Sequence, residues 1–207
     1  MKFPSQFHKN AVRVAMAGAA IFLSSCAAVK PHHYSTSYDP PLVQPTNPSA
    51  VHVKLSTGAQ RVYVMEGSRV LLASPCSVGP ATAPTPHGHF TIYNKDAHRR
   101  RQSEPGSGYP MTFWMEFAPA YGMHWGFVKP YPCTHGCVRL PIKTAQKMFS
   151  VVRVGTPIDI ASSFPEDATV GNTLPVLDDG PMPDPPWSYM SSPQVFVDAS
   201  QGKFYTY

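Results

Sequence analysis

Alternation of apolar and polar residues predicts several short β-strands in the middle of the chain. Residues 51–56 alternate, a turn follows at Thr57-Gly58, and residues 60–65 alternate again. This pattern is typical of strands that bury one face. Further strands are expected where β-branched and aromatic residues gather between Gly and Pro, at residues 69–79, 89–94, 111–118 and 158–162.

One segment instead has the spacing of a helix. Ile142, Ala145, Phe149 and Val152 recur at intervals of three and four residues directly after Pro141. Proline is tolerated where a helix begins because the N–H that it lacks would be unpaired there. The expected fold class is therefore mostly β, a sandwich-like domain with one or two short helices.

Residues 1–26 have the pattern of a secretory signal peptide. Lys2, Lys9 and Arg13 precede an apolar stretch that is shorter than the roughly 20 residues a membrane-spanning helix needs. Its end, LSSC, resembles a bacterial lipobox. That resemblance implies a lipidated Cys26 and a periplasmic protein anchored to the outer membrane by its lipid. An ordinary signal peptide with a chance cysteine is the alternative.

Charge and proline positions set the domain organisation. Without the signal's three basic residues the net charge falls from +5 to +2, which is too small to indicate a nucleic-acid partner. The basic run at 98–101 is expected to be a solvated loop. Pro-rich segments are stiff and form cores poorly. We therefore expect, after the signal, a tether at 27–49, one folded domain at 50–162, a linker or wrap at 163–193 and a strand segment at 194–207, where VFVDASQGKFYTY resembles the first hairpin.

Candidate chemistry is concentrated in YPCTHGCVRLP at residues 131–141. In an extended chain Cys133, His135 and Cys137 would share one face, and together with His124 they are ligand types that zinc accepts. Export, which favours thiol oxidation, and a spacing unlike that of common zinc sites both weigh against a metal. We therefore expect none.

The cysteines allow a second interpretation. Three remain once Cys26 is lipidated, and an odd count in an exported chain indicates a reactive thiol. Cys76 and Cys133 are either bridged by a disulfide or, as we favour, two small buried apolar side chains.

A nucleophilic Cys137 accounts for the most residues at once. Its pKa would have to be lowered by a cation or by N–H groups for the thiolate to attack, and a histidine would take the proton and return it to the leaving amine. Gly136 allows close backbone approach, so that its N–H and that of Cys137 would face a developing oxyanion. Arg139, on the same face, would hold a substrate carboxylate.

The segment THGCVRL at 134–140 resembles the signature of the L,D-transpeptidase catalytic domain family. His124, thirteen positions before Cys137, matches the family's upstream histidine in a branch with short spacing. Two earlier segments, SVG at 77–79 and TPHGHFTIYNKD at 85–96, resemble further family segments in the expected order. The resemblance covers residues 50–162.

The resemblance implies a β-sandwich with a defined set of site residues. Cys137 would be the nucleophile, and His124 the general base, oriented by a neighbouring backbone carbonyl. The other implied residues are Thr134, His135 and Gly136, which would line the site and its oxyanion position, and Arg139 and Trp125, which would contact the substrate.

The implied substrate is a peptidoglycan stem peptide, with no metal or organic cofactor. Attack on the carbonyl of its third residue, a diamino acid, would release the terminal D-alanine and leave a thioester. The acceptor amine stays open between a 3→3 crosslink, a D-amino acid and the lysine of a lipoprotein. A hydrolase (amidase or carboxypeptidase) with the same Cys–His pair and a non-catalytic wall-binding lipoprotein are the alternatives. The sequence does not indicate an oligomeric state.

Overall fold

The computed structural model describes residues 33–104, 106 and 108–204. The signal segment and its Cys26 lie outside the described residues, so the expected lipidation stays a prediction. Within the described ranges, no helix has both the length and the apolar character needed to cross a membrane.

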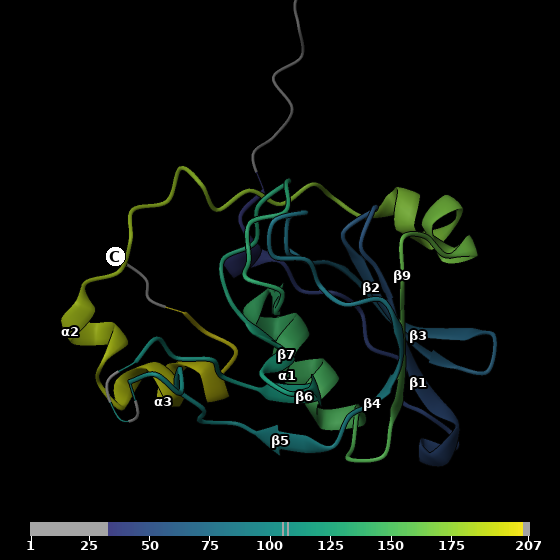
Figure 1. Ribbon diagram of the computed structural model, residues 1–207, viewed down its shortest axis with the longest axis horizontal. Coiled ribbons are helices and arrows are strands. Elements are labelled where there is room, and N and C mark those ends of the chain that lie inside the picture. The colour runs from purple at the N-terminus through teal and green to yellow at the C-terminus, as the bar shows by residue number, and fades with distance from the viewer. Residues whose placement is uncertain (1–32, 105, 107, 205–207) are drawn as a thin grey trace, which may run out of the picture. The chain divides into compact units, whose positions relative to one another are not determined.

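The larger of the two sheets contains the hairpin that the first alternating segments predict (Figure 1). Its strands are β1 (Val51–Ser56), β2 (Arg61–Glu66), β3 (Arg69–Pro75), β4 (Gly88–Thr91) and β9 (Pro157–Ala161), in the order β3-β2-β1-β9-β4. β1 and β2 pair in antiparallel fashion with Val53 opposite Val64, while β9 runs parallel to β1. The predicted hairpin is confirmed.

The smaller sheet carries the candidate chemistry. Its strands are β5 (Asn94–Asp96), β6 (Trp114–Ala118), β7 (Tyr121–Trp125) and β8 (Val138–Leu140), in that order across the sheet. Met115, Met123 and Val138 are fully buried on one face because successive strand residues point to opposite sides. The opposite face is therefore left for polar side chains.

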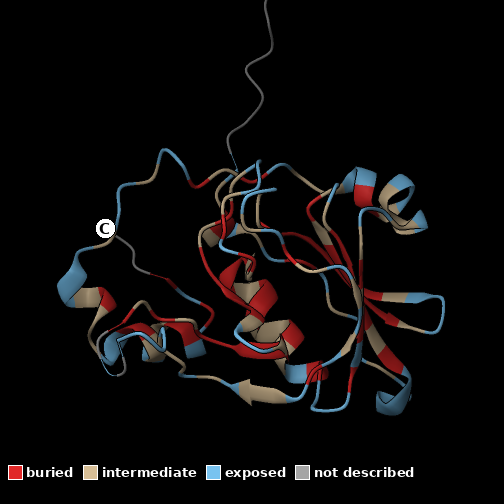
Figure 2. Ribbon diagram, viewed as in Figure 1, coloured by how far each residue is buried: buried red, intermediate tan, exposed pale blue. Residues whose placement is uncertain are grey.

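The predicted helix is confirmed as α1 (Ile142–Val151), which begins directly after Pro141. Its buried residues include Ile142, Ala145 and Met148, and they join side chains of both sheets in a single apolar core. Figure 2 shows this buried interior as red segments of α1 and the surrounding strands. The expected class, mostly strands in two sheets with few helices, is confirmed.

The Pro-rich segment before β1 does not leave the domain surface as a tether would. Its described part, 33–49, contains the short 3₁₀ helices η1 (Ser35–Ser37) and most of η2 (Pro48–Ala50). The N–H of Val43 donates to the carbonyl of Leu71 at 2.9 Å, and Lys147 pairs with Asp39 at 2.5 Å. Backbone and charge contacts thus hold the described part of the expected tether to the domain, and its role as a tether stays a prediction.

Residues 163–193 also lie against the domain. They include the 3₁₀ helices η3 (Pro165–Ala168) and η4 (Val170–Thr173) and the short helix α2 (Trp187–Met190). Buried Asp179 accepts hydrogen bonds from the N–H groups of Ser35 (2.8 Å) and Val128 (2.7 Å). One carboxylate thus ties both Pro-rich segments to the chain before β8.

The strand expected at 194–207 is wrong over the described residues. Gln194–Ser200 form helix α3, which starts after Pro193. Val195 and Ala199, four residues apart, are buried on one side of this helix. In a segment of seven residues, the apolar positions fit the spacing of a strand as well as that of a helix. Packing of Val195 and Ala199 on the core favours the helix.

Candidate active site

A cavity of about 450 Å³ opens on the polar face of the smaller sheet. Cys137 and His124 both line it. The remaining lining residues are Arg99, Arg101, Gln102, Ser103, Tyr109, Met111, Trp114, Ala120, Thr134, His135 and Arg139. The sequence-predicted nucleophile and base are therefore brought to one cavity from two different strands.

Strand register explains how these side chains meet. β7 and β8 run parallel with His124 opposite Arg139, so Cys137, two residues before Arg139, shares the face of both. The antiparallel register of β6 and β7 pairs Met115 with Met123 and so sets Trp114 beside His124, with ring centres 5.7 Å apart. The cavity floor is thus a row that runs from β6 to β8.

Gly136 shapes the backbone directly before Cys137. Its φ is +103°, in the region that favours glycine, and a Cβ there would lie 2.3 Å from Cε1 of Tyr121. The turn points the Cys137 thiol at the backbone of the β6–β7 connection, where its Sγ–H donates to the carbonyl of Ala120 at 3.6 Å. The close approach predicted for this glycine is therefore a contact with Tyr121.

The thiol of Cys137 is not a preformed thiolate. Burial raises its pKa, and a hydrogen bond from the backbone N–H of Gly122 together with the charges of Arg139 and Arg99 opposes that rise without reversing it. The expected lowering of this pKa is wrong for the free protein because desolvation penalises the charged form more than these groups favour it. The proton must therefore leave during attack.

His124 is held as a neutral acceptor. His124 is only 4% exposed, and this burial lowers the pKa of its imidazole to about 4. The charge of Arg139 also lowers this pKa, whereas the hydrogen bond to the backbone of Trp125 raises it. The Nδ1–H of His124 donates to the carbonyl of Trp125 at 2.5 Å. This bond leaves Nε2 without a proton and ready to accept one. A backbone carbonyl beside the histidine is the orienting group that the family resemblance implies.

Thr134 occupies one of the two amide groups expected at the oxyanion position. The N–H of Gly136 donates to Oγ1 of Thr134 at 3.1 Å, and Thr134 in turn donates to the carbonyl of Cys137 at 2.6 Å. The expectation that the Gly136 N–H faces the oxyanion is therefore wrong in this conformation, because the threonine side chain already binds that donor.

Two segments upstream in the sequence hold this turn in place. Thr85, from the TPHG segment, donates its hydroxyl to the carbonyl of Gly136 at 2.9 Å. The SVG segment at 77–79 exchanges backbone hydrogen bonds with Arg139 through Ser77, at 2.9 and 3.0 Å. These motifs therefore support the turn that carries Cys137.

Trp125 does not line the cavity. It is 2% exposed, stacks on Tyr109 with ring centres 6.0 Å apart, and packs against Phe204 at 4.2 Å. The predicted substrate contact is wrong because Trp125 follows His124 on a strand, so its side chain points to the core. His135, by contrast, is exposed at the rim, as expected of a residue that lines the site.

The basic run at 98–101 is solvated only in part, since His98 and Arg101 are exposed whereas Arg99 and Arg100 are half-buried. Arg99 lies over the ring of Trp114 at 4.5 Å and pairs with Glu116 at 3.8 Å, and Arg101 also lines the cavity. Arg100 points away and donates to the carbonyls of Met190, Ser191 and Ser192 at 2.8 to 3.1 Å. The sequence interpretation is wrong for Arg99 and Arg100 because their partners come from a distant strand and from the C-terminal segment.

The other cysteines do not form a second reactive cluster. Cys76, Cys133 and Cys137 are all free thiols. Cys76 is buried, as favoured, and burial raises its pKa to about 12, whereas Cys133 is half-buried and receives a weak contact from Nη1 of Arg139 at 3.9 Å. No group of three His, Cys, Asp or Glu side chains among the described residues is placed to hold a metal ion.

Known proteins resemble this chain over its catalytic part. The profile of the L,D-transpeptidase catalytic domain matches residues 48–160. The chain is similar to YkuD of Bacillus subtilis (strain 168), with 30% identity over 114 residues that cover 53% of this chain and 65% of the relative. YkuD of Bacillus licheniformis is 29% identical over 120 residues, which are 56% of this chain and 67% of that protein. The chain thus spans about two thirds of the length of these curated relatives.

The fold has a counterpart among solved structures. An L,D-transpeptidase from Stackebrandtia nassauensis superimposes with a TM-score of 0.50 and 18% identity over 60% of each chain. At that identity the likeness concerns the fold alone.

Proposed function

The chain belongs to the L,D-transpeptidase catalytic domain family, and from that membership we propose that it transfers the acyl group of a peptidoglycan stem peptide to an amine through a thioester on Cys137. The observation that carries the proposal is the hydrogen bond from Nδ1–H of His124 to the carbonyl of Trp125 at 2.5 Å. It presents a bare Nε2 in the cavity that also holds the thiol. A neutral thiol and a neutral imidazole that line the same cavity are suited to general-base catalysis.

Acylation begins with the thiol and the imidazole both uncharged. As Sγ of Cys137 bonds to the stem-peptide carbonyl, its proton passes to Nε2 of His124, and the carbonyl oxygen becomes an oxyanion. The N–H of Cys137 is the donor that this chain offers to that charge, and one such donor contributes about 3 kcal/mol to a barrier. The C–N bond then breaks, and the imidazolium returns the proton to the departing D-alanine amine.

Deacylation runs the same exchange with an amine as nucleophile. The acceptor nitrogen attacks the thioester, its proton passes to His124, the C–S bond breaks, and the proton returns to the thiolate. Because water is present at about 55 M, transfer requires the acceptor amine to be held in position before attack. We propose an amine acceptor because the family is one of transpeptidases, and hydrolysis is the outcome to test against it.

The test is a product assay on tetrapeptide muropeptides with the purified full chain. With an amine acceptor present we expect crosslinked or exchanged product, and the Cys137→Ala variant should form none. Tripeptide as the sole product, at every acceptor concentration, would overturn transfer in favour of a carboxypeptidase. Absence of any product with intact, folded protein would overturn the enzymatic proposal as a whole.

We also propose that the chain acts in the periplasm as a lipoprotein attached through Cys26. The LSSC sequence after a short apolar stretch supports this location. Metabolic labelling with an alkyne fatty acid in a Gram-negative host should mark the full chain and not the Cys26→Ser variant. Equal labelling of both proteins, or of neither, would contradict the anchor.

A further inference from the structure

We propose that Arg99 and Arg101 form a second carboxylate subsite, across the cavity from Arg139, so that the enzyme selects acyl donors that carry two carboxylates. This inference rests on the proposed acyl transfer at Cys137 and names its substrate class more closely. The two arginines come from the connection between β5 and β6, whereas Arg139 lies on β8, which is the edge of the smaller sheet opposite to β5.

Arg99 is the strongest single indication of an anionic ligand. Its side chain is 13% exposed, and its Nε–H is buried with no hydrogen-bond acceptor among the described residues. Glu116 lies 3.8 Å away, a distance at which the charges interact without forming a hydrogen bond. A guanidinium has five donors in a planar fork, and a carboxylate accepts two of them side by side. Arg99 therefore lines the cavity with a guanidinium that its nearest carboxylate, that of Glu116, does not hydrogen-bond.

The cavity has a strongly one-sided charge. Its lining includes three arginines and, in the described part of the chain, no aspartate or glutamate. Glu116, two residues after Trp114 on β6, is only 8% exposed and accepts a hydrogen bond from the indole Nε1–H of Trp114 at 3.2 Å. A cavity lined by one sign of charge concentrates oppositely charged ligands. The net charge of +5, which is the difference between 17 Lys and Arg and 12 Asp and Glu, does not by itself indicate a cavity lined by positive charge.

The spacing of the arginines limits the ligand. Arg139 lies in the cross-strand row of His124 and Trp114, and Arg99 lies over Trp114 at the far end of that row. Two strand spacings, roughly 10 Å, therefore separate the two cationic ends. A donor held at both ends is an extended peptide with one carboxylate near the attacked carbonyl and a second carboxylate two or three residues away.

The C-terminal segment holds the second subsite in position. Arg100, between the two lining arginines, donates to three consecutive carbonyls at 190–192 and to that of Gly108, and its guanidinium lies 4.7 Å from the ring of Phe196. His98 packs on the same ring at 5.1 Å. The side chains of residues 98 and 100 thus fix the connection from behind, while Arg99 and Arg101 face the cavity.

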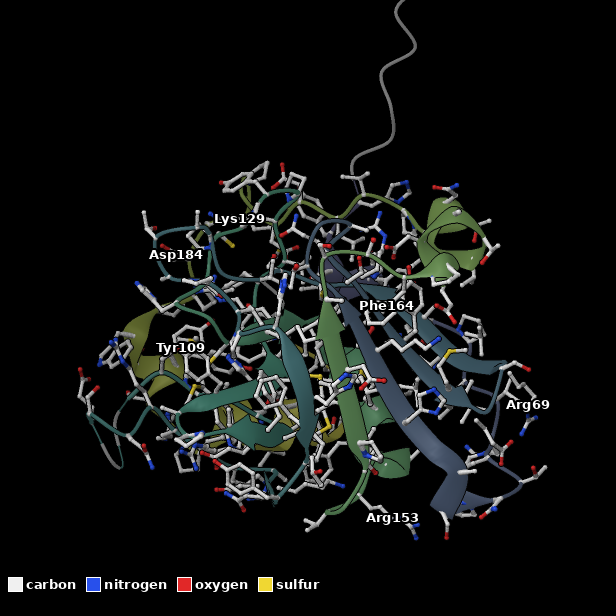
Figure 3. All side chains as sticks on the ribbon, turned by 45° about the vertical axis from the view of Figure 1, so that its right-hand side comes forward. Arg69, Tyr109, Lys129, Arg153, Phe164 and Asp184 are labelled. Atoms are coloured by element: carbon white, nitrogen blue, oxygen red, sulfur yellow. The ribbon has the colours of Figure 1, made fainter. Side chains whose placement is uncertain are left out.

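A chemical test of the subsite needs no transpeptidation. Full-length protein is alkylated with anionic iodoacetate or with neutral iodoacetamide, and modification of Cys137 is followed by peptide mass spectrometry. The rate with iodoacetate divided by the rate with iodoacetamide should fall about ten-fold in the Arg99→Gln/Arg101→Gln variant. The reason is that a cavity lined by positive charge raises the local concentration of an anion by ten-fold or more. The matched control is Arg153→Gln, an exposed arginine that Figure 3 shows well apart from Tyr109 of the cavity wall. An unchanged ratio in the double variant overturns the subsite.

Donor peptides then identify what the subsite binds. In synthetic tetrapeptide donors, one free carboxylate at a time is replaced by a carboxamide. In the wild-type enzyme, one of these replacements should lower kcat/KM by about ten-fold or more, which is the effect of losing a single charged hydrogen bond. In the Arg101→Gln variant, the same replacement should leave kcat/KM unchanged. Arg101 is exposed, so this variant retains the fold. If every donor is turned over equally well, whichever carboxylate is replaced, the subsite is overturned and acyl transfer stands. If no donor is turned over but the ratio of iodoacetate to iodoacetamide rates still falls in the double variant, acyl transfer alone is overturned.

Discussion

His124 lies directly opposite Arg139 in the parallel register of β7 and β8. The charge of that arginine adds to burial in lowering the pKa of His124 and works against burial at Cys137. The same cation therefore disfavours an imidazolium and favours a thiolate. Burial dominates at both groups, so the pair is neutral in the free protein.

The first prediction concerns the reactivity of the free thiol. Because burial raises the pKa of Cys137 above its ordinary value of 9.0, iodoacetamide should modify Cys137 slowly at pH 7, with a rate that keeps rising beyond pH 9. Rates at pH 5 to 10, measured on the Cys137 peptide, give the profile. A plateau already reached near pH 6 would mean a thiolate–imidazolium pair and contradict the neutral resting state.

The second prediction concerns stability in acid. The pKa of His124 is about 4 in the folded protein against 6.5 as its ordinary value, so the unfolded chain takes up this proton first as the pH falls. Stability should be lost between pH 6.5 and pH 4, by about 3 kcal/mol in total from this group. Denaturant unfolding of wild type and His124→Gln at pH 7 and pH 4 isolates the difference. Equal acid losses in the two proteins would refute the buried neutral imidazole.

The third prediction concerns the turn before the nucleophile. Gly136→Ala places a Cβ 2.3 Å from Tyr121 at a φ of +103°, so the turn must move. A displacement of this kind costs about 100-fold in kcat/KM. The matched control is Gly67→Ala, which also has a positive φ (+59°) but meets nothing within 4 Å. It should cost about 1 kcal/mol of stability and leave turnover unchanged. Equal activity of the two variants would show that the turn is not needed in this form.

The fourth prediction concerns the C-terminal segment. Arg100→Ala removes four hydrogen bonds to backbone carbonyls, of which three belong to Met190, the last residue of α2, and to Ser191 and Ser192 directly after it. The free energy of unfolding should fall by about 2 to 4 kcal/mol, whereas Arg101→Ala, at an exposed neighbour, should change it by no more than about 0.5 kcal/mol. Denaturant unfolding measures both. Matching values for the two variants would mean that Arg100 does not fasten the segment.

The elements that could be predicted from the sequence are those whose pattern of apolar residues is long enough to distinguish the period of a strand from that of a helix. The hairpin from 51 to 66 alternates over two full strands, and α1 repeats its apolar positions over three turns. The helix at 194–200 spans only two turns, and its side against α1 is chosen by packing. The local pattern of apolar residues is therefore not sufficient where the type of an element is determined by packing against residues distant in the sequence.

The candidate site divides in the same way. Cys137 and His124 were found because a nucleophile and its base are defined by residue type and motif. The alternation rule, applied to β7, would also have removed Trp125 from the site, since its neighbour His124 already faces the cavity. The position of Arg99 had no local signal, because Trp114 and Glu116, which it contacts, lie some fifteen residues later on β6.

Covalent trapping with a carbapenem tests the central claim most directly, because its strained carbonyl stands in for that of the stem peptide. Intact-mass spectrometry of the full chain under reducing conditions should show one adduct, mapped to Cys137. The adduct should be absent from Cys137→Ala, kept in Cys76→Ala and Cys133→Ala, and formed at least 100-fold more slowly in His124→Gln, as the loss of a general base requires. An adduct on Cys133, or an undiminished rate without the imidazole of His124, would contradict the account.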